Sequence, residues 1–140
     1  MGYRYSEKGP TADLTVEAWG DTLEEAFGSV ARAMFNSMTP IEGIRGAESR
    51  SFEVEADDLG GLLFNFIDEL LYIHEVELMV FSGFELVIDQ ARNRLNAVCR
   101  GEGFDLSRHE QGIAIKAVTF HNMSIDKVDS GWEIRVVLDT

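Results

Sequence analysis

The chain has 140 residues and 45% of them are apolar, which predicts one globular domain spanning residues 1–140. Its 25 acidic residues outnumber 12 basic ones, and the net charge of −13 argues against binding to free RNA or DNA, because such binding depends on lysine and arginine. The single cysteine, Cys99, excludes an internal disulfide, and no apolar run reaches the ~20 residues of a membrane span. We therefore expect a cytoplasmic protein whose partner is a protein or a cation, unless the charge serves only to keep it soluble.

Residues 11–38 predict a strand that leads into an amphipathic helix. Apolar and polar side chains alternate over residues 14–20, as in a half-buried strand. Thr22 is a good N-cap and Glu25 completes a capping box, so that each side chain satisfies a backbone N–H of the first turn. Pro40 ends the helix, because proline disfavours the α conformation in the residue before it. The apolar stripe of this helix consists of Leu23, Ala26, Phe27, Val30, Ala31, Met34, Phe35 and Met38.

A second strand and a second helix follow. Residues 52–56 alternate between apolar and polar side chains, and either Asp57 or Asp58 caps the helix that comes next. Few polar residues lie opposite the apolar stripe, so we expect this helix to be the more deeply buried of the two. Its stripe consists of Leu59, Leu62, Leu63, Phe66, Ile67, Leu70 and Leu71.

The remaining residues predict mainly strands. Residues 84–89 and 94–99 form one antiparallel pair, in which Cys99 is a small buried side chain and not a nucleophile. Residues 113–125 and 132–138 form the last hairpin. Because the strands are segregated and only two helices are present, we predict an α+β fold, with two amphipathic helices packed on a largely antiparallel β-sheet.

The first arm of the last hairpin contains an irregularity. Strict alternation of apolar and polar side chains breaks near Ala117 and Val118, which predicts a β-bulge there. Such a bulge would re-aim neighbouring side chains, including Lys116 and His121.

Most of the common catalytic motifs are absent from the chain. It has no glycine-rich phosphate loop, no nucleophile elbow and no zinc-ligand spacing among its three histidines. Oxygen ligands remain: Asp13, Asp139 and the terminal carboxylate of Thr140 could converge if the first and last strands are neighbours, which spacing alone does not decide. Three anionic oxygen groups would suit calcium or magnesium and would not select zinc. The alternative is that the Asp-Thr terminus is simply frayed.

Five stretches, in order along the chain, resemble a known family. They are Thr11-Ala12-Asp13, the run from Ala18 to Phe27 (AWGDTLEEAF), Leu70-Leu71-Tyr72, the run from Ile115 to His121 (IKAVTFH) and Val136-Val137-Leu138-Asp139. With these motifs the chain resembles the archease family over essentially all 140 residues.

This resemblance implies a function in RNA processing. Archeases assist the tRNA-splicing RNA ligase, which joins cyclic-phosphate and hydroxyl RNA ends. The family member promotes guanylylation of the ligase's active-site histidine and allows many turnovers. The chain would therefore be a protein cofactor and not an enzyme.

The resemblance also implies a metal site at Asp13, Asp139 and the carboxylate of Thr140. Calcium is the ion associated with the family, and other hard cations such as magnesium or manganese would suit the same ligands. Lys116 is a candidate contact to the ligase, or equally a solvent-exposed strand lysine. One departure concerns Pro10, which stands where the family commonly has histidine and leaves any role of that histidine in doubt.

Two other functions remain open from the sequence. A general chaperone or modulator of protein or RNA-processing enzymes would explain the acidic surface without any metal. A metal-dependent hydrolase would use the carboxylates to hold an ion that activates water, but it needs a further acid or base that the sequence does not supply.

Overall fold

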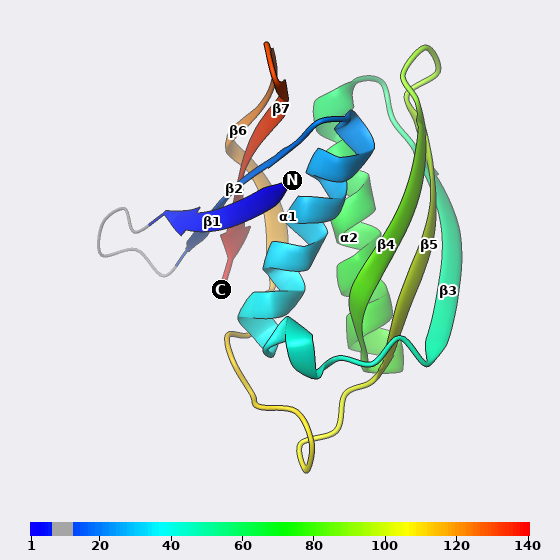
Figure 1. The fold of residues 1–140 in the computed structure, drawn as a ribbon, viewed down its shortest axis with the longest axis vertical. Coiled ribbons are helices and arrows are strands. Elements are labelled where there is room, and N and C mark those ends of the chain that lie inside the picture. The colour runs from blue at the N-terminus through cyan, green and yellow to red at the C-terminus, as the bar shows by residue number, and fades with distance from the viewer. Residues whose placement is uncertain (7–12) are drawn as a thin grey trace.

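A computed structural model describes residues 1–6 and 13–140 of the chain. Two antiparallel sheets enclose a layer of two helices (Figure 1). The four-stranded sheet has the order β1-β2-β7-β6, formed by β1 (Gly2–Ser6), β2 (Leu14–Gly20), β7 (Gly131–Asp139) and β6 (Ala117–Val128). The three-stranded sheet has the order β3-β5-β4, formed by β3 (Glu48–Glu55), β5 (Arg94–Gly103) and β4 (Met79–Asp89). The helices are α1 (Leu23–Met38), α2 (Leu59–Glu77) and the short 3₁₀ helix η1 (Ile41–Gly43).

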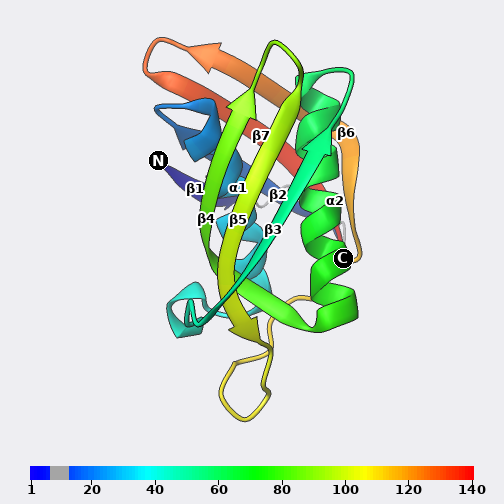
Figure 2. The same ribbon diagram turned by 90° about the vertical axis from the view of Figure 1, so that its right-hand side faces the viewer.

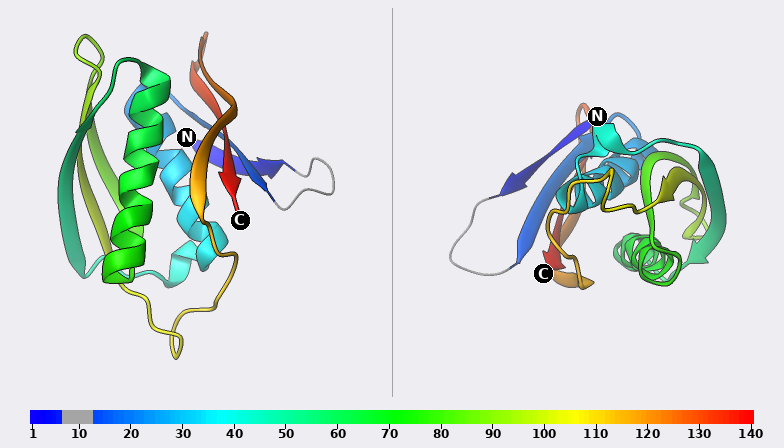
Figure 3. Two further views of the ribbon diagram at one scale, coloured as in Figure 1. Left: turned by 180° about the vertical axis from the view of Figure 1, so that it is seen from behind. Right: turned by 90° about the horizontal axis from the view of Figure 1, so that it is seen from below.

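The predicted α+β class is confirmed, and the structure adds that the strands are divided between two sheets. Helix α1 packs on β2 of the four-stranded sheet and on β4 of the three-stranded sheet. Helix α2 contacts β6 on one side and β3 on the other, as Figure 3 shows from behind. Figure 2 shows the three-stranded sheet in front of α1, with α2 alongside β3. The core is therefore a helical layer with a sheet on each side.

The start of α1 forms as its sequence predicts. Thr22 is the N-cap, and its hydroxyl accepts a hydrogen bond from the backbone N of Glu25 at 3.1 Å. The carboxylate of Glu25 in turn accepts from the backbone N of Asp21 at 3.1 Å, one residue before the cap. In α2 the cap is Asp58, which accepts from the backbone N of Gly61 at 2.7 Å.

The expected order of burial was wrong, because α1 and not α2 is the more deeply buried helix. Small residues of α1, including Gly28, Ser29 and Ala31, are buried along with its large apolar ones, since sheets lie on both sides of this helix. The outer face of α2 meets solvent, where Tyr72 is 60% exposed and Val76 is 61% exposed. A pattern of apolar residues reports one buried face, and it does not reveal a second sheet on the opposite side.

Aromatic side chains connect the two helices and the second sheet. The rings of Phe27 on α1 and Phe66 on α2 stack with centroids 6.2 Å apart. Phe35 of α1 meets Phe81 of β4 edge to face at 5.5 Å.

Cys99 is buried as predicted, and burial raises the pKa of its thiol to about 12, so the nucleophilic thiolate is not formed at neutral pH.

The predicted bulge exists but lies later in the strand. Pairing of β6 with β7 continues through Thr119 and shifts register before Ser124, so the prediction of a bulge at Ala117 and Val118 was wrong. The shifted segment contains His121 and also Asn122, whose φ of 55° interrupts the extended backbone. Phe120, in the same segment, stacks on Phe64 of α2 with ring centroids 4.3 Å apart. The segment therefore contacts α2 where it leaves the regular β6–β7 pairing.

The first arm of the last hairpin begins four residues later, and ends three residues later, than its sequence predicts. Strand β6 begins at Ala117, and the backbone N atoms of Gly112 and Ile113 donate instead to the last carbonyls of α1, those of Met38 and Ser37, at 2.7 and 2.8 Å.

No helix among the described residues combines the length and the apolar character that crossing a membrane requires.

Candidate functional site

The two aspartates of the predicted metal site come from neighbouring strands. Asp13 lies directly before β2 and Asp139 is the last residue of β7. Strands β2 and β7 are antiparallel, and Leu14 pairs with Leu138, so continuing this register by one residue places Asp13 opposite Asp139. The adjacency that the sequence left undecided is therefore present in the fold.

Side-chain alternation sets the face on which these carboxylates lie. Leu14 and Leu138 pack into the core beside the helices. Because successive side chains of a strand point to opposite faces, the alternation places Asp13 and Asp139 on the outer face of the four-stranded sheet. Both residues are exposed.

Lys116 and Thr140 lie at the same end of this sheet. The backbone N of Lys116 donates a hydrogen bond to the carbonyl oxygen of Asp139 at 2.7 Å. Thr140 follows Asp139 and is half-buried, whereas Lys116 is exposed. All four predicted site residues therefore gather where β2, β6 and β7 meet, near the point marked C in Figure 1.

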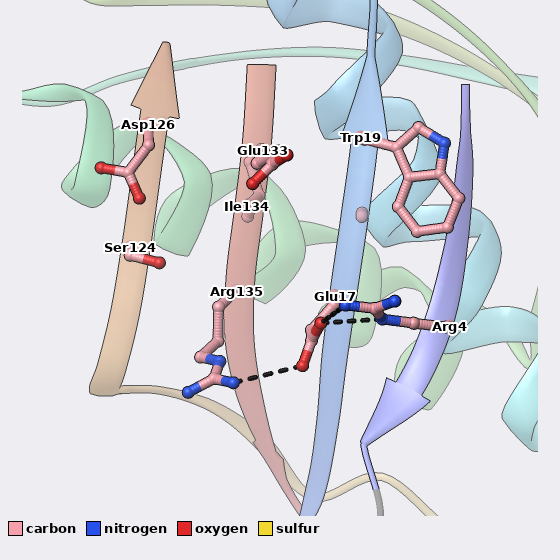
Figure 4. A pocket seen from close by; sticks show the side chains of 9 residues that line it. Arg4, Glu17, Trp19, Ser124, Asp126, Glu133, Ile134 and Arg135 are labelled. Carbon is pink, nitrogen blue, oxygen red and sulfur yellow. Dashed lines mark hydrogen bonds and ion pairs between the residues drawn. The ribbon is translucent and has the colours of Figure 1, made fainter. Parts of the chain in front are cut away.

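A second feature of the same outer face was missed by the sequence analysis. Glu17 accepts hydrogen bonds from Nε and Nη2 of Arg4 at 2.8 and 2.7 Å, and from Nη2 of Arg135 at 3.2 Å (Figure 4). Hydrogen bonds from Arg4, and then those from Arg135, lower the pKa of Glu17. These side chains line a shallow hollow of about 480 Å³, together with Trp19 and Glu133. The alternation of side chains in β2 and β7 predicts that Glu17 and Arg135 point outward. The ion pair between Glu17 and Arg4 was not predictable in this way, because it depends on the pairing of β1 with β2.

The three histidines have different surroundings. Nδ1 of His74 is 2.8 Å from the carbonyl oxygen of Met79, and its ring meets Phe35 edge to face. His109 lies in a buried network with Glu102, and His121 is exposed in the shifted segment of β6. Within residues 1–6 and 13–140, no group of three or more His, Cys, Asp or Glu side chains is arranged to hold a metal.

Among the residues that the structure describes, the candidate site contains two such side chains, Asp13 and Asp139, and the predicted third ligand is the terminal carboxylate of Thr140. Pro10, Thr11 and Ala12 lie outside the described residues, and the prediction about Pro10 with them.

Comparison with known proteins identifies the family. The model of the Archease protein family (MTH1598/TM1083) matches residues 3–140. The chain belongs to this family. It is 41% identical over 132 residues to protein archease of Pyrococcus abyssi, covering 92% of this chain and 93% of that protein. It is also 41% identical over 140 residues to protein archease of Pyrobaculum calidifontis, covering 98% of this chain and 94% of that protein.

A solved structure shows the same fold. The solution structure of Methanobacterium thermoautotrophicum protein 1598 superposes with a TM-score of 0.85 at 38% identity, covering 99% of each chain. The resemblance predicted from the five motifs is thus confirmed, and so is the arrangement of two helices packed on antiparallel sheets.

Proposed function

We propose that this chain acts in tRNA splicing, in the cytoplasm, as a metal-binding protein activator of the tRNA-splicing RNA ligase. It promotes guanylylation of the ligase and multiple turnover, and it catalyses no reaction of its own. Family membership supports this role, and the observation that carries the site assignment is the position of Asp13 opposite Asp139 on neighbouring strands.

The ligand set fits a hard cation. Directly opposed residues on antiparallel strands have Cβ atoms about 5 Å apart, and like charges at such positions repel. Within residues 1–6 and 13–140, neither aspartate takes part in an ion pair. Asp13, Asp139 and the carboxylate of Thr140 would hold calcium, or magnesium or manganese, through oxygen atoms alone. The ion would supply positive charge at an otherwise anionic end of the sheet.

Charge also suggests how the chain meets its partner. With a net charge of −13, the chain complements a basic surface on the ligase, and such complementarity speeds encounter. Lys116 is exposed beside the two aspartates, and in this proposal its ammonium group contacts an acidic group of the ligase. The chain does not bind RNA directly.

The test measures guanylylation of the ligase with substituted forms of this chain. Asp13→Asn and Asp139→Asn keep the size of each side chain and remove its charge, and we expect both to lower guanylylation toward the level of the ligase alone. The matched control is Asp68→Asn, at an exposed position on α2, which we expect to stimulate fully. Full stimulation by both site variants would refute the site assignment. If those variants also suppressed aggregation of unrelated proteins, a general chaperone would be the better interpretation.

A further inference from the structure

The connection between β5 and β6 carries the most unusual set of contacts away from the candidate site. Residues 104–116 run from the three-stranded sheet to the four-stranded sheet without forming a helix or strand. Connections of this length without secondary structure are uncommon, and they are usually either functional or disordered. This connection makes hydrogen bonds and packing contacts with the rest of the fold along its length, and it ends at Lys116.

The first of these contacts involves a buried histidine. The side chain of His109 has no exposed surface, and its ring stacks on Phe104 at a centroid distance of 5.4 Å. Nδ1 of His109 accepts a hydrogen bond from the backbone N of Asp105 at 2.9 Å. Because Nδ1 is an acceptor, the ring proton is on Nε2, which lies 3.0 Å from Oε2 of Glu102. Both ring nitrogens are therefore used.

Glu102 is the common partner of three residues, one near the end of η1 and two in the connection. Its Oε2 atom accepts from the backbone N of Arg45 at 2.7 Å and from His109, and it forms an ion pair with Arg108. Burial raises the pKa of Glu102, but the hydrogen bonds from Arg45, Arg108 and His109 outweigh burial and lower it to about 2. The carboxylate is ionised at any pH at which the protein would act.

The second half of the connection is fixed by backbone hydrogen bonds. Gly112 and Ile113 donate to the last carbonyls of α1, and Lys116 donates to Asp139. A Cβ atom at position 112 would collide with the carbonyl oxygen of Ser37, so the two backbones are in close contact there. The two residues between His109 and Gly112 are therefore held between fixed points on each side. The position of His109 in this way restricts the position of Gly112.

We propose that His109 is a positioning residue for the candidate site. Together with Glu102 it holds the first half of the connection, so that the second half crosses the end of α1 and brings Lys116 beside Asp139. The consequence for ligase activation rests on the proposed function, whereas the consequence for the position of Lys116 does not.

Hydrogen exchange measured by NMR tests the positioning directly. In His109→Ala we expect the amide of Lys116 to exchange about tenfold faster or more, because the hydrogen bonds of His109 that hold the first half of the connection are lost. His109→Asn keeps an acceptor near the Nδ1 position, so we expect a smaller increase. The matched control is His121→Ala, an exposed histidine, which should leave this amide unchanged. The amide of Val16, at the centre of β2, should accelerate less than that of Lys116 in His109→Ala, because it reports only the loss of stability of the whole domain.

Two exchange results would overturn the proposal. An unchanged rate at Lys116 in His109→Ala would show that the histidine does not position it. An equal acceleration at Lys116 and Val16 would show that His109 only stabilises the whole domain.

Ligase activation provides a second, independent readout through a double-mutant cycle. If His109 acts through Lys116, the variant with both His109→Asn and Lys116→Ala should activate the ligase as well as Lys116→Ala alone. Additive losses would contradict the proposal, because they would place the effect of His109 elsewhere. Full activation by Lys116→Ala alone would instead refute the partner contact in the proposed function, and the exchange rates would still decide the role of His109.

Discussion

Replacing Glu102 with glutamine should destabilise the protein in a way that depends on pH. The substitution keeps the size of the side chain but removes the charge that meets Arg45 N, Arg108 and His109. The pKa of this carboxyl is lowered from 4.5 to about 2, and at 1.36 kcal/mol for each unit of pKa difference the ionised form stabilises the fold by at most about 3.4 kcal/mol. The side chain keeps 15% exposure, and screening by this solvent leads us to expect about 2 kcal/mol.

The sign of the pH dependence follows from the lowered pKa. Because the carboxyl binds its proton more weakly in the folded state, its contribution is complete above about pH 4.5 and is lost as the pH falls toward about 2. Urea unfolding of the unsubstituted chain and of Glu102→Gln, at a series of pH values, would measure the difference. It should be about 2 kcal/mol at pH 7 and vanish near pH 2.

A suitable control is Glu85→Gln, because Glu85 is 71% exposed and its ion pair with Arg100 is long, at 3.7 Å. We expect the control to change the free energy of unfolding by less than about 0.5 kcal/mol. A difference for Glu102→Gln that stays constant between pH 7 and pH 2, or that is absent at pH 7, would refute the reasoning.

Other predictions concern the connection, the terminus and the charge of the chain. Gly112→Ala should destabilise by about 1–3 kcal/mol in thermal unfolding, because its Cβ would meet the Ser37 carbonyl, whereas Gly43→Ala points into open space and should cost less than about 0.5 kcal/mol; equal effects would contradict the close contact. Residues added after Thr140 should weaken calcium binding measured by calorimetry, and an unchanged affinity would exclude the terminal carboxylate as a ligand. Stimulation of the ligase should fall as ionic strength rises from about 0.05 to 0.5 M, and a salt-independent rate would argue against electrostatic docking.

The parts of the fold that were predicted correctly are those decided by neighbours in sequence. The cap at Thr22, the strand at residues 14–20 and the end of α1 before Pro40 each depend on a few consecutive residues. The division into two sheets was not predictable in the same way, because an alternating pattern gives a strand one buried face without naming its partner strand. The same limit explains why the burial of α1 was underestimated.

The candidate site and its surroundings differ in how far the sequence could define them. Family resemblance pointed to Asp13 and Asp139, but it is the β2–β7 pairing, continued by one residue beyond Leu14 and Leu138, that places them opposite each other. Glu102 and His109 carry no recognisable motif, because the network depends on Arg45 from a distant segment. The β6 bulge likewise coincides with a contact to α2, through Phe120, that no local pattern contains.

The outer face of the β2–β7 ladder carries two pairs of opposed charged residues, and the two pairs differ in net charge. At Glu17 and Arg135 the opposed residues have opposite charges, and Arg4 supplies a second guanidinium to the same carboxylate. At Asp13 and Asp139 the opposed charges are alike, and the backbone of Lys116, not its charge, is what contacts Asp139 among the described residues. The proposed ion, or a cationic group of the ligase, would supply at the end of the ladder the charge that arginines supply in its middle.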